Sequence, residues 1–307
     1  MSELTRSEWL ERRRSGIGGS DVAPILGLSR WKTPRDIWLS KIDTAVDIED
    51  RPTLQQLIGT ALESHVLRLY SEQTGRHVRR SHQLHVDPDY PMLIANLDAR
   101  TAGRLVEIKT ARNDDDWGDP GSDDVPQDYW LQVQHYLQVT RVPVCDVAVL
   151  FLNQSQPDVA VYEIPRSEQY AEVVAELVDW WDRHVEGKSE PAPTTSADCS
   201  RRWPRSNKAE AIATHEALIA IEELRGLKAA MKAMEDRKDQ LETVIKSTMG
   251  EAERLHQSGT VLATWKTQST SRVDTKRLRA EFPEAARVCT VESTVRRFLL
   301  KGGSGDE

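Results

Sequence analysis

Two acidic side chains and one lysine fall close together around residue 100, at spacings that suit metal-assisted phosphoryl chemistry. Asp98 and Glu107 are followed by Lys109. Carboxylates, carbonyls and water are the oxygen ligands that Mg²⁺ and Mn²⁺ prefer. Such a cation polarises a phosphate oxygen and activates water, and Lys109 can orient that water or offset charge that builds on the phosphate. A surface hairpin whose charges simply face solvent is the competing interpretation.

A β-hairpin would bring these three groups together. Two apolar-rich segments flank residues 101–103, a short stretch that ends in glycine and is typical of a tight turn. After the turn, Glu107 and Lys109 stand two positions apart, so a strand presents both on the same face. Asp98 lies one strand earlier, in a strand predicted over residues 92–99, and the hairpin can place its carboxylate beside Glu107.

A helix predicted over residues 126–139 carries uncharged hydrogen-bonding groups. Gln132 lies three positions after Tyr129 and four before Tyr136, so the three side chains share one helix face. Amide and phenol groups suit a DNA backbone phosphate or a metal-bound water, and Tyr129 and Tyr136 are candidate DNA-binding residues. A half-buried helix with a polar edge is the alternative.

Two earlier segments carry charged groups that could join the same site. A helix predicted over residues 54–74 places Glu63 beside its apolar stripe, where it can point into the site or into solvent. Arg13 precedes a glycine-rich stretch, and a new helix can begin at Ser20. Free N–H groups at a helix start bind phosphate, and an arginine adds charge-assisted contacts. An ordinary glycine-rich loop with a capping serine is the alternative.

These four segments resemble, in order, the motifs of the lambda exonuclease/YqaJ-type viral recombinase family, which is part of the PD-(D/E)xK nuclease superfamily. The matching residues are Arg13-x6-Ser20, Gly59-x3-Glu63, Asp98-x8-Glu107-x-Lys109 and Gln132-x3-Tyr136. The resemblance covers residues 6–187. Leu97 stands where the motif usually has proline, a change that the motif tolerates.

The resemblance implies an α/β fold, with a restriction-endonuclease-like core in which helices flank a mixed sheet. It also implies Mg²⁺- or Mn²⁺-dependent digestion of the 5′-ended strand of linear duplex DNA, which leaves 3′ single strands for phage-type recombination. The implied metal ligands are Asp98, Glu107 and the Ile108 carbonyl. The other implied catalytic residues are Lys109 on the nucleophilic water, Glu63 in a supporting role and Gln132 near the scissile bond. The implied 5′-phosphate ligands are Arg13 and Ser20.

The family also implies partners, namely double-stranded DNA ends, a single-strand annealing protein and a ring-shaped homo-oligomer. Two other functions stay open. A related endonuclease would use the same site without requiring a DNA end, and a non-catalytic DNA-binding or assembly module could keep the fold. The intact Asp98, Glu107 and Lys109 argue against the non-catalytic module, because a degenerate copy has no reason to keep all three.

Composition bounds the compartment and the surface. No run of eighteen apolar residues exists, and residues 1–14 lack the apolar core of a signal peptide, so we expect no membrane partner and no export. Three cysteines without CxxC spacing favour a reducing cytoplasm and argue against zinc or iron–sulfur sites. The resemblance implies that this is the cytoplasm of a bacterial or phage-infected cell. Residues 1–200 carry 21 Lys and Arg against 33 Asp and Glu, a balance of −12, whereas residues 201–307 carry 20 against 16, a balance of +4.

The chain is long enough for two domains. We predict a nuclease domain over residues 1–190, a proline-rich linker over 191–205, a helical, coiled-coil-like and small β extension over 206–301, and a disordered tail over 302–307. Residues 206–249 predict one long helix, or a helical hairpin bent at Gly226. Segments around 261–265 and 272–273 predict a small β-hairpin.

The long helix carries a heptad-like stripe that one helix cannot bury alone. Its positions are Leu224, Leu227, Met231, Met234, Lys238, Leu241, Ile245 and Thr248. We expect residues 206–301 to assemble the protein with itself or with a partner, and their basic end to contact DNA. The intramolecular hairpin is the alternative, because Lys238 would weaken a simple dimer seam.

Overall fold

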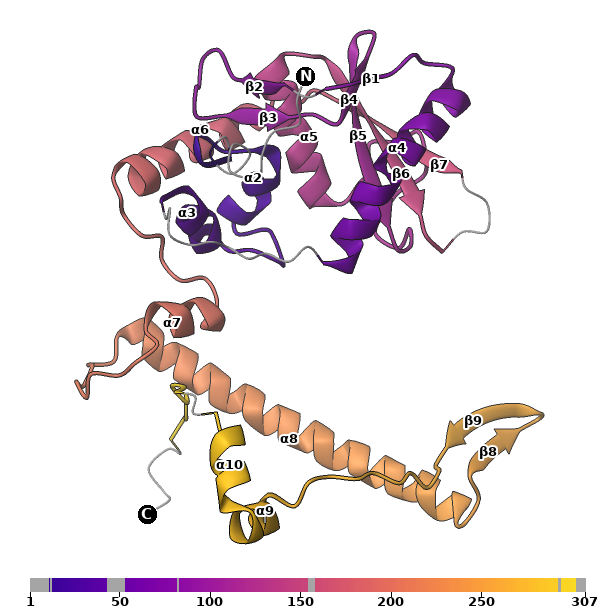
Figure 1. Ribbon diagram of the computed structural model, residues 1–307, viewed down its shortest axis with the longest axis vertical. Helices are drawn as coiled ribbons and strands as arrows, with labels where there is room; N and C mark the ends of the chain where they lie inside the picture. The colour runs from indigo at the N-terminus through magenta and orange to yellow at the C-terminus, as the bar shows by residue number, and fades with distance from the viewer. Residues whose placement is uncertain are drawn as a thin grey trace. The chain divides into compact units, whose positions relative to one another are not determined.

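The computed structural model describes residues 11, 13–42, 53–81, 83–153, 158–291 and 294–301. The chain divides into two compact units between Arg202 and Trp203. Figure 1 shows the elements of each unit along the chain. The tail that we predicted to be disordered, residues 302–307, lies outside the described residues.

The first unit is built on a five-stranded mixed sheet in the order β1-β4-β5-β6-β7. The strands are β1 Arg79–Arg80, β4 Ala99–Thr101, β5 Arg104–Ala111, β6 Val144–Phe151 and β7 Val159–Pro165. Only β5 and β6 run parallel. The chain crosses between them through helix α5, Gln127–Thr140, because parallel neighbours need a long connection. The expected mixed sheet flanked by helices is confirmed.

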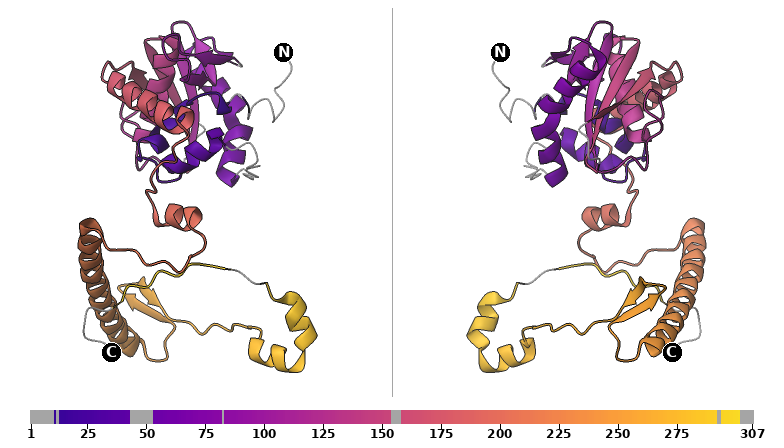
Figure 2. Two further views of the ribbon diagram at one scale, coloured as in Figure 1. Left: turned by 90° about the vertical axis from the view of Figure 1, so that its left-hand side faces the viewer. Right: turned by 90° about the vertical axis from the view of Figure 1, so that its right-hand side faces the viewer.

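Side-chain alternation along β5 sends its residues into two separate cores. Val106 and Ile108 pack with Val66 and Tyr70 of helix α4, Leu54–Thr74. Leu105 packs in the other core, which includes the apolar side chains of α5. Helices therefore cover both faces of the sheet (Figure 2), and the face of Glu107 is the α5 face.

The glycine-rich N-terminal stretch leads into helix α2, Gly19–Ile25, and then into helix α3, Pro34–Ile42. The stretch is anchored by a backbone bridge, in which the Ile17 amide donates to Met92 O at 2.6 Å. Leu93 leads into strand β3, Ile94–Asn96, which pairs with β2, Leu84–Val86, in a separate small sheet. After β7, helix α6, Tyr170–Trp180, continues as a π-helical turn, η1, Trp181–Glu186.

The strand predicted over residues 92–99 is wrong as a single element. Strand β3 ends at Asn96, β4 begins at Ala99, and the two pair in different sheets. Asp98 therefore stands at a bend between the sheets and not within a strand. The predicted turn of the following hairpin is confirmed, with Gly103 at φ 72°, a left-handed conformation that glycine adopts without steric cost.

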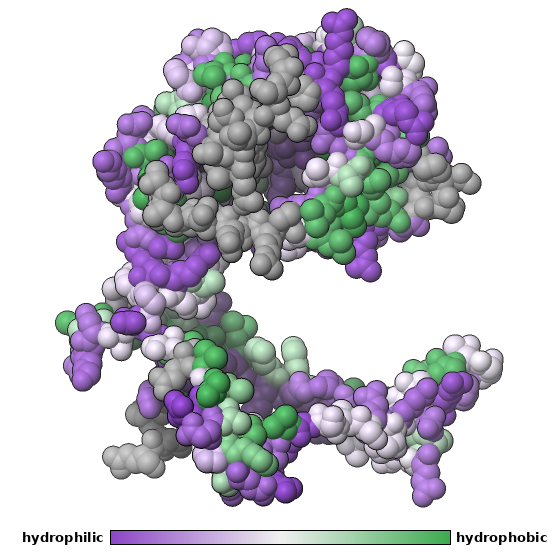
Figure 3. All heavy atoms as spheres, in the orientation of Figure 1, coloured by the Kyte–Doolittle hydropathy of each residue, from purple (hydrophilic) through white to green (hydrophobic). Residues whose placement is uncertain are grey.

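The apolar stripe of α4 extends beyond the sheet that it covers. Val66 and Tyr70 are buried, whereas Leu54 and Leu57 in the first turns are exposed. Figure 3 shows hydrophobic side chains gathered over this end of the helix. Gly59 brings the same end close to β5, since a Cβ at this position would lie 3.4 Å from the Thr110 hydroxyl.

The segment predicted as a linker contains helix α7, Ser196–Arg202, and belongs to the first unit. Its Asp198 is buried and accepts a hydrogen bond from the Thr33 hydroxyl at 3.1 Å. Arg201 forms an ion pair with Asp36 of α3 at 2.9 Å. The first unit thus ends at Arg202, beyond the residue 190 that we expected from the sequence.

The second unit contains one long helix, α8 His215–Met249, which passes through Gly226 without interruption and ends at Gly250. The alternative of a hairpin bent at Gly226 is therefore wrong. The β-hairpin pairs β8, Arg254–Gln257, with β9, Thr260–Thr264, so the predicted pairing of residues 261–265 with 272–273 is also wrong. Two short helices follow, α9 Thr275–Glu281 and α10 Pro283–Cys289. None of the described helices is long and apolar enough to span a membrane.

Candidate active site

Asp98, Glu107 and Lys109 lie together beside the middle of β5, just beyond its pairing with β4. The pairing of β4 with β5 stops at Ala99 and Val106. Two residues further on, the Ile108 amide donates instead to Asp98 Oδ2 at 2.8 Å. The Lys109 ammonium donates to Glu107 Oε1 at 2.6 Å. The hairpin therefore places both carboxylates and the lysine together, as the spacing predicts.

The carboxylate of Glu107 is shielded from water and lies close to a second carboxylate, that of Asp98. Glu107 is only 3% exposed. Burial, and then the charge of Asp98, raise the pKa of Glu107 to about 8, although Lys109 opposes the shift. Burial alone would lower the pKa of Lys109, but the attraction of Glu107 and Asp98 outweighs it and the pKa is raised. Lys109 is thus a cation, and Glu107 takes up a proton readily.

Helix α5 supplies the next layer of the site. Gln132 Nε2 donates to Glu107 Oε1 at 2.9 Å and to the Tyr136 hydroxyl at 2.7 Å. Gln132 Oε1 accepts from Lys109 at 3.1 Å. The side-chain amide of Gln132 therefore contacts Glu107, Lys109 and Tyr136 at once. The predicted shared face of Gln132 and Tyr136 is confirmed, and Tyr136 itself is buried.

Tyr129 reaches the site through its ring. The Lys109 ammonium lies 4.9 Å from the ring centroid, which is a cation–π contact. The Tyr129 ring also stacks on Trp117, with ring centroids 5.4 Å apart. Trp117 belongs to the acidic segment between β5 and α5. Because that segment also donates from Gly121 N to Val161 O at 2.7 Å, it is fastened to the outer strand β7.

Helix α2 lies directly against the same face of α5. A Cβ on Gly19 would lie 2.6 Å from Tyr136 Cε1 and 3.0 Å from the Gln132 carbonyl oxygen. Only glycine allows this approach. Ser20 is the next residue and is exposed. The glycine-rich motif and the Gln132-x3-Tyr136 motif therefore form one surface beside Glu107.

A buried ion pair that the sequence analysis missed holds the glycine-rich turn. The Lys41 ammonium, fully buried, donates to Asp21 Oδ2 at 2.7 Å and to the Gly16 carbonyl at 2.7 Å. Arg13 approaches the other oxygen of Asp21 at 3.5 Å. A signal existed in the sequence, because Lys41 lies four positions after the apolar Ile37 and hence on the buried face of α3.

Glu63 stands apart from this cluster. It lies on α4, at the opposite face of the sheet, and forms an ion pair with Arg80 of β1 at 2.9 Å. The structure therefore brings together Asp98, Glu107, Lys109, Gln132, Tyr136 and Tyr129, with Ser20 and Arg13 beside them. No contact within the described part of the chain joins Glu63 to Asp98 or Glu107.

The oxygen donors of the site suit a hard divalent cation. Asp98 and Glu107 offer carboxylates that repel each other, and a cation between them would relieve the repulsion that raises the pKa of Glu107. Among the described residues, no group of three or more His, Cys, Asp or Glu side chains forms a ready metal cage. A cation here would need a backbone carbonyl, water or substrate oxygens as further ligands, as Mg²⁺ sites commonly do.

Comparisons with known proteins find relatives of this chain in sequence and in fold. Residues 8–143 match the YqaJ-like viral recombinase domain. An uncharacterized protein YqaJ of Bacillus subtilis (strain 168) is 31% identical over 310 residues, which span 98% of this chain and 95% of that protein. The similarity thus includes the second unit.

Among solved structures, the alkaline exonuclease LHK-Exo of Laribacter hongkongensis shares the fold, with a TM-score of 0.50 and 20% identity over 59% of this chain and 93% of that one. LHK-Exo in complex with dAMP gives a TM-score of 0.50 and 19% identity over 64% and 97%. These matches confirm the α/β fold that the sequence predicted.

Proposed function

Because this chain belongs to the YqaJ-like viral recombinase family, we propose that it is a metal-dependent deoxyribonuclease that degrades linear duplex DNA from its 5′ ends. The observation that carries the proposal is the buried Glu107 beside the half-buried Asp98, in the middle of β5 where the pairing with β4 has ended. Lys109 and Gln132 both contact Glu107 there. The proposed degradation would expose 3′ single strands for recombination. The fold shared with an alkaline exonuclease is consistent with this chemistry.

Asp98, Glu107 and the Ile108 carbonyl are the proposed ligands of Mg²⁺ or Mn²⁺. The N–H and C=O of one strand residue point to the same side. Since the Ile108 amide points at Asp98, its carbonyl points the same way, beyond the end of the β4 pairing. A divalent cation held there would polarise the phosphate and make a water molecule more acidic.

Lys109 and Gln132 act on the reacting groups in this proposal. The ammonium of Lys109 stays charged, so it offsets negative charge that develops on the phosphate and orients the attacking water. Gln132 fixes the positions of the Lys109 and Glu107 side chains relative to each other, through one hydrogen bond to each. Tyr136 fixes the orientation of that amide, and Tyr129 supports the lysine through its ring.

Arg13 and Ser20 are the proposed ligands of the 5′-terminal phosphate. The close approach of Gly19 to Gln132 supports this role, because it sets Ser20 next to the catalytic face. One oxygen of the Asp21 carboxylate orients Arg13, and the ammonium of Lys41 neutralises the carboxylate through the other oxygen. Glu63 is proposed only in a supporting role, through its ion pair with Arg80.

The decisive experiment measures the digestion of an end-labelled linear duplex and, in parallel, of a closed circular duplex. Only the alternative function, an endonuclease, would cut the closed circle. We expect cleavage of the linear DNA only, and only with Mg²⁺ or Mn²⁺. Asp98→Ala, Glu107→Ala and Lys109→Ala should each lower the rate by at least about 10²-fold, the scale of removing one transition-state contact. Glu72→Ala, on the exposed surface of α4, is the matched acidic control.

Near-parental cleavage by the Asp98 or Glu107 variant would overturn the site assignment. Cutting of the closed circle would favour the endonuclease. DNA binding without cleavage under every metal condition would favour the non-catalytic module.

We further propose that residues 206–301 assemble the enzyme, as a homo-oligomer or with a single-strand annealing protein, in the cytoplasm of a bacterial or phage-infected cell. The support is the apolar stripe of α8. Met231 is 69% and Met234 72% exposed within the described structure, and Leu227, Leu241 and Ile245 are exposed as well. Apolar side chains in this arrangement are buried in an assembled coil.

A further inference from the structure

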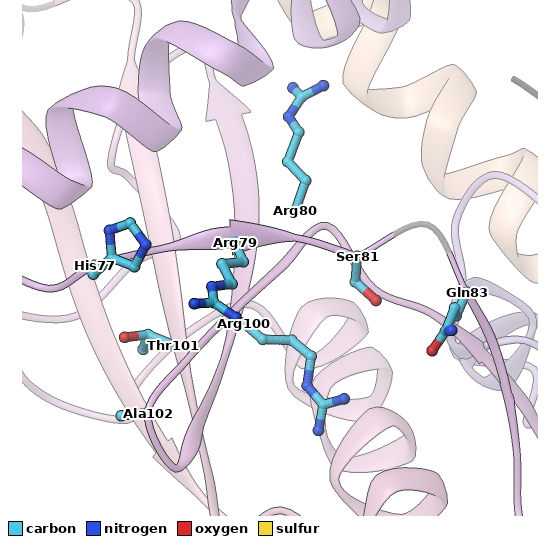
Figure 4. Close-up of a pocket in the computed structure, with 8 residues that line it drawn as sticks. All are labelled: His77, Arg79, Arg80, Ser81, Gln83, Arg100, Thr101 and Ala102. Carbon is cyan, nitrogen blue, oxygen red and sulfur yellow. The ribbon is translucent and has the colours of Figure 1, made fainter. Parts of the chain in front are cut away.

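An open groove runs along the β1 edge of the sheet and carries a concentration of positive charge. Its volume is about 560 Å³. The lining residues are His77, Arg79, Arg80, Ser81, Gln83, Arg100, Thr101 and Ala102. None of them is acidic, although residues 1–200 have a balance of −12. Figure 4 shows that Arg80 extends away from Arg79 and Arg100, which project from neighbouring strands.

The two strands place like charges directly opposite each other. Arg79 of β1 is the partner of Arg100 in β4. Like charges in directly opposed positions destabilise an antiparallel pair. Both residues are exposed, and in the part of the chain that the structure describes neither has a carboxylate within ion-pair distance. Arg80, by contrast, is paired with Glu63 at 2.9 Å.

Other arginines near this sheet are neutralised. Arg76 and Arg104 both donate to the buried Asp146, at 2.5 and 2.8 Å. The groove therefore differs from its surroundings, because two of its guanidinium groups keep their hydrogen-bond donors directed toward solvent. An arrangement that costs stability and leaves donors available suits an anionic ligand.

The strand register relates the groove to the catalytic carboxylates. Arg100 is the partner of Leu105, and Leu105 and Glu107 point to one face of β5. Arg79, Arg100 and Glu107 are thus on the same face of the sheet. The Ser81 amide donates to the Asp98 carbonyl at 3.1 Å, so the groove begins next to the active site.

We propose that this groove binds the phosphodiester backbone of the DNA strand adjoining the scissile bond, with Arg79 and Arg100 as its phosphate ligands. The inference rests on the proposed DNA substrate. Guanidinium groups bind phosphate oxygens through paired, charge-assisted hydrogen bonds. Because backbone contacts carry no base information, the groove positions the strand without reading its sequence. An open channel suits a continuing chain of phosphates better than a single small anion.

The test is equilibrium binding of a fluorescently labelled DNA duplex to the full-length protein, with Ca²⁺ in place of Mg²⁺, over a series of salt concentrations. The double variant Arg79→Gln/Arg100→Gln should bind about tenfold weaker or more, because each lost contact is a charge-assisted hydrogen bond. When the logarithm of the affinity is plotted against the logarithm of the salt concentration, the slope for this variant should be shallower than the parental slope by about 1.4–1.8, as expected for two lost phosphate contacts. Arg79→Lys/Arg100→Lys, which keeps both charges, should retain most of the slope.

The matched control is Arg68→Gln/Arg183→Gln, which removes the same charge from two exposed ion pairs elsewhere in the first unit. Parental affinity and slope in the groove variant, or an equal loss in the control, would overturn the inference. Circular dichroism melting distinguishes unfolding from lost binding.

Cleavage distinguishes the failure of this inference from failure of the proposed function. If the parent never cuts DNA but the groove variant loses affinity and slope as expected, the groove stands and the nuclease proposal fails. If Asp98→Ala loses cleavage while the groove variant cuts and binds like the parent, the nuclease stands and the groove inference fails.

Discussion

Glu107 combines deep burial with a neighbouring carboxylate, so its proton would compete with the cation that we propose for this site. Its pKa is raised to about 8 from an ordinary value of 4.5. Between these values the folded protein holds a proton that the unfolded chain has lost, so the free energy of unfolding of the metal-free protein falls as pH rises through this window. A cation must displace that proton, so its apparent affinity should rise about tenfold per pH unit below pH 8.

Calorimetric titration with Mn²⁺ at pH 7, in buffers of different ionisation enthalpy, measures this coupling. We expect close to one proton released per cation bound. Glu107→Gln should abolish the release, while Glu72→Gln on the surface of α4 should leave it unchanged. Mn²⁺ binding to the parent without proton release would show that Glu107 is already ionised at pH 7.

The proposed phosphate contact of Arg13 would let the protein distinguish DNA ends by their terminal group. Arg13→Ala should slow the digestion of 5′-phosphorylated ends about tenfold or more, because it removes a charge-assisted contact, and should have little effect on 5′-hydroxyl ends. Rates on matched duplexes with the two ends provide the measurement, and Arg30→Ala, at an exposed arginine of the same unit, is the control. An equal loss on both ends would exclude Arg13 as a phosphate ligand.

At the scale of elements, the site depends on how closely α2 approaches α5. Gly19→Ala would press a methyl group against Tyr136 and the Gln132 backbone. Overpacking of this kind costs about 1–3 kcal/mol. We expect a lower melting temperature together with slower cleavage, since Gln132 holds the catalytic residues.

Gly18→Ala is the adjacent control, because a Cβ there meets only Asp21 Oδ2 at 3.7 Å and the backbone φ is −90°. Equal behaviour of the two variants in thermal melting and in cleavage would show that the contact between α2 and α5 does not support the site.

The elements also show which features a single sequence can predict. The sharing of a face by Glu107 and Lys109, and by Gln132 and Tyr136, follows from local periodicity and is confirmed. The spacing from Ile37 indicates that Lys41 lies on the buried face of α3, but its pairing with Asp21 depends on packing between segments, so no local pattern specifies the partner. The break before Asp98 was missed because it arises from pairing with two different sheets. The roles of these residues in catalysis stay predictions.

At the scale of the whole molecule, the two units should separate chemistry from assembly. Truncation after Arg202 keeps α7 and its Asp198–Thr33 hydrogen bond, which truncation at residue 190 would remove. The shortened protein should be monomeric by light scattering and still cut short duplexes slowly.

In the full-length protein, the double variant Met231→Glu/Leu241→Glu should also lower the molar mass per particle, because it places charge in the apolar stripe of α8. Asp236→Lys, which lies off the stripe, is the control. A truncated protein that keeps the parental molar mass would contradict the assembly role.

The order of strands along the chain has a consequence for protein synthesis. Strand β5 carries Glu107 and Lys109, yet it pairs with β4 only from Arg104 to Val106, while β6 covers it from Leu105 to Ala111. Helix α5 and β6 are both translated after β5. A polypeptide still on the ribosome with β5 exposed therefore lacks Gln132 and the strand that buries Glu107. If the protein has the proposed nuclease activity, the nascent chain would not be able to cut DNA until Phe151, at about half of its length, had been synthesised.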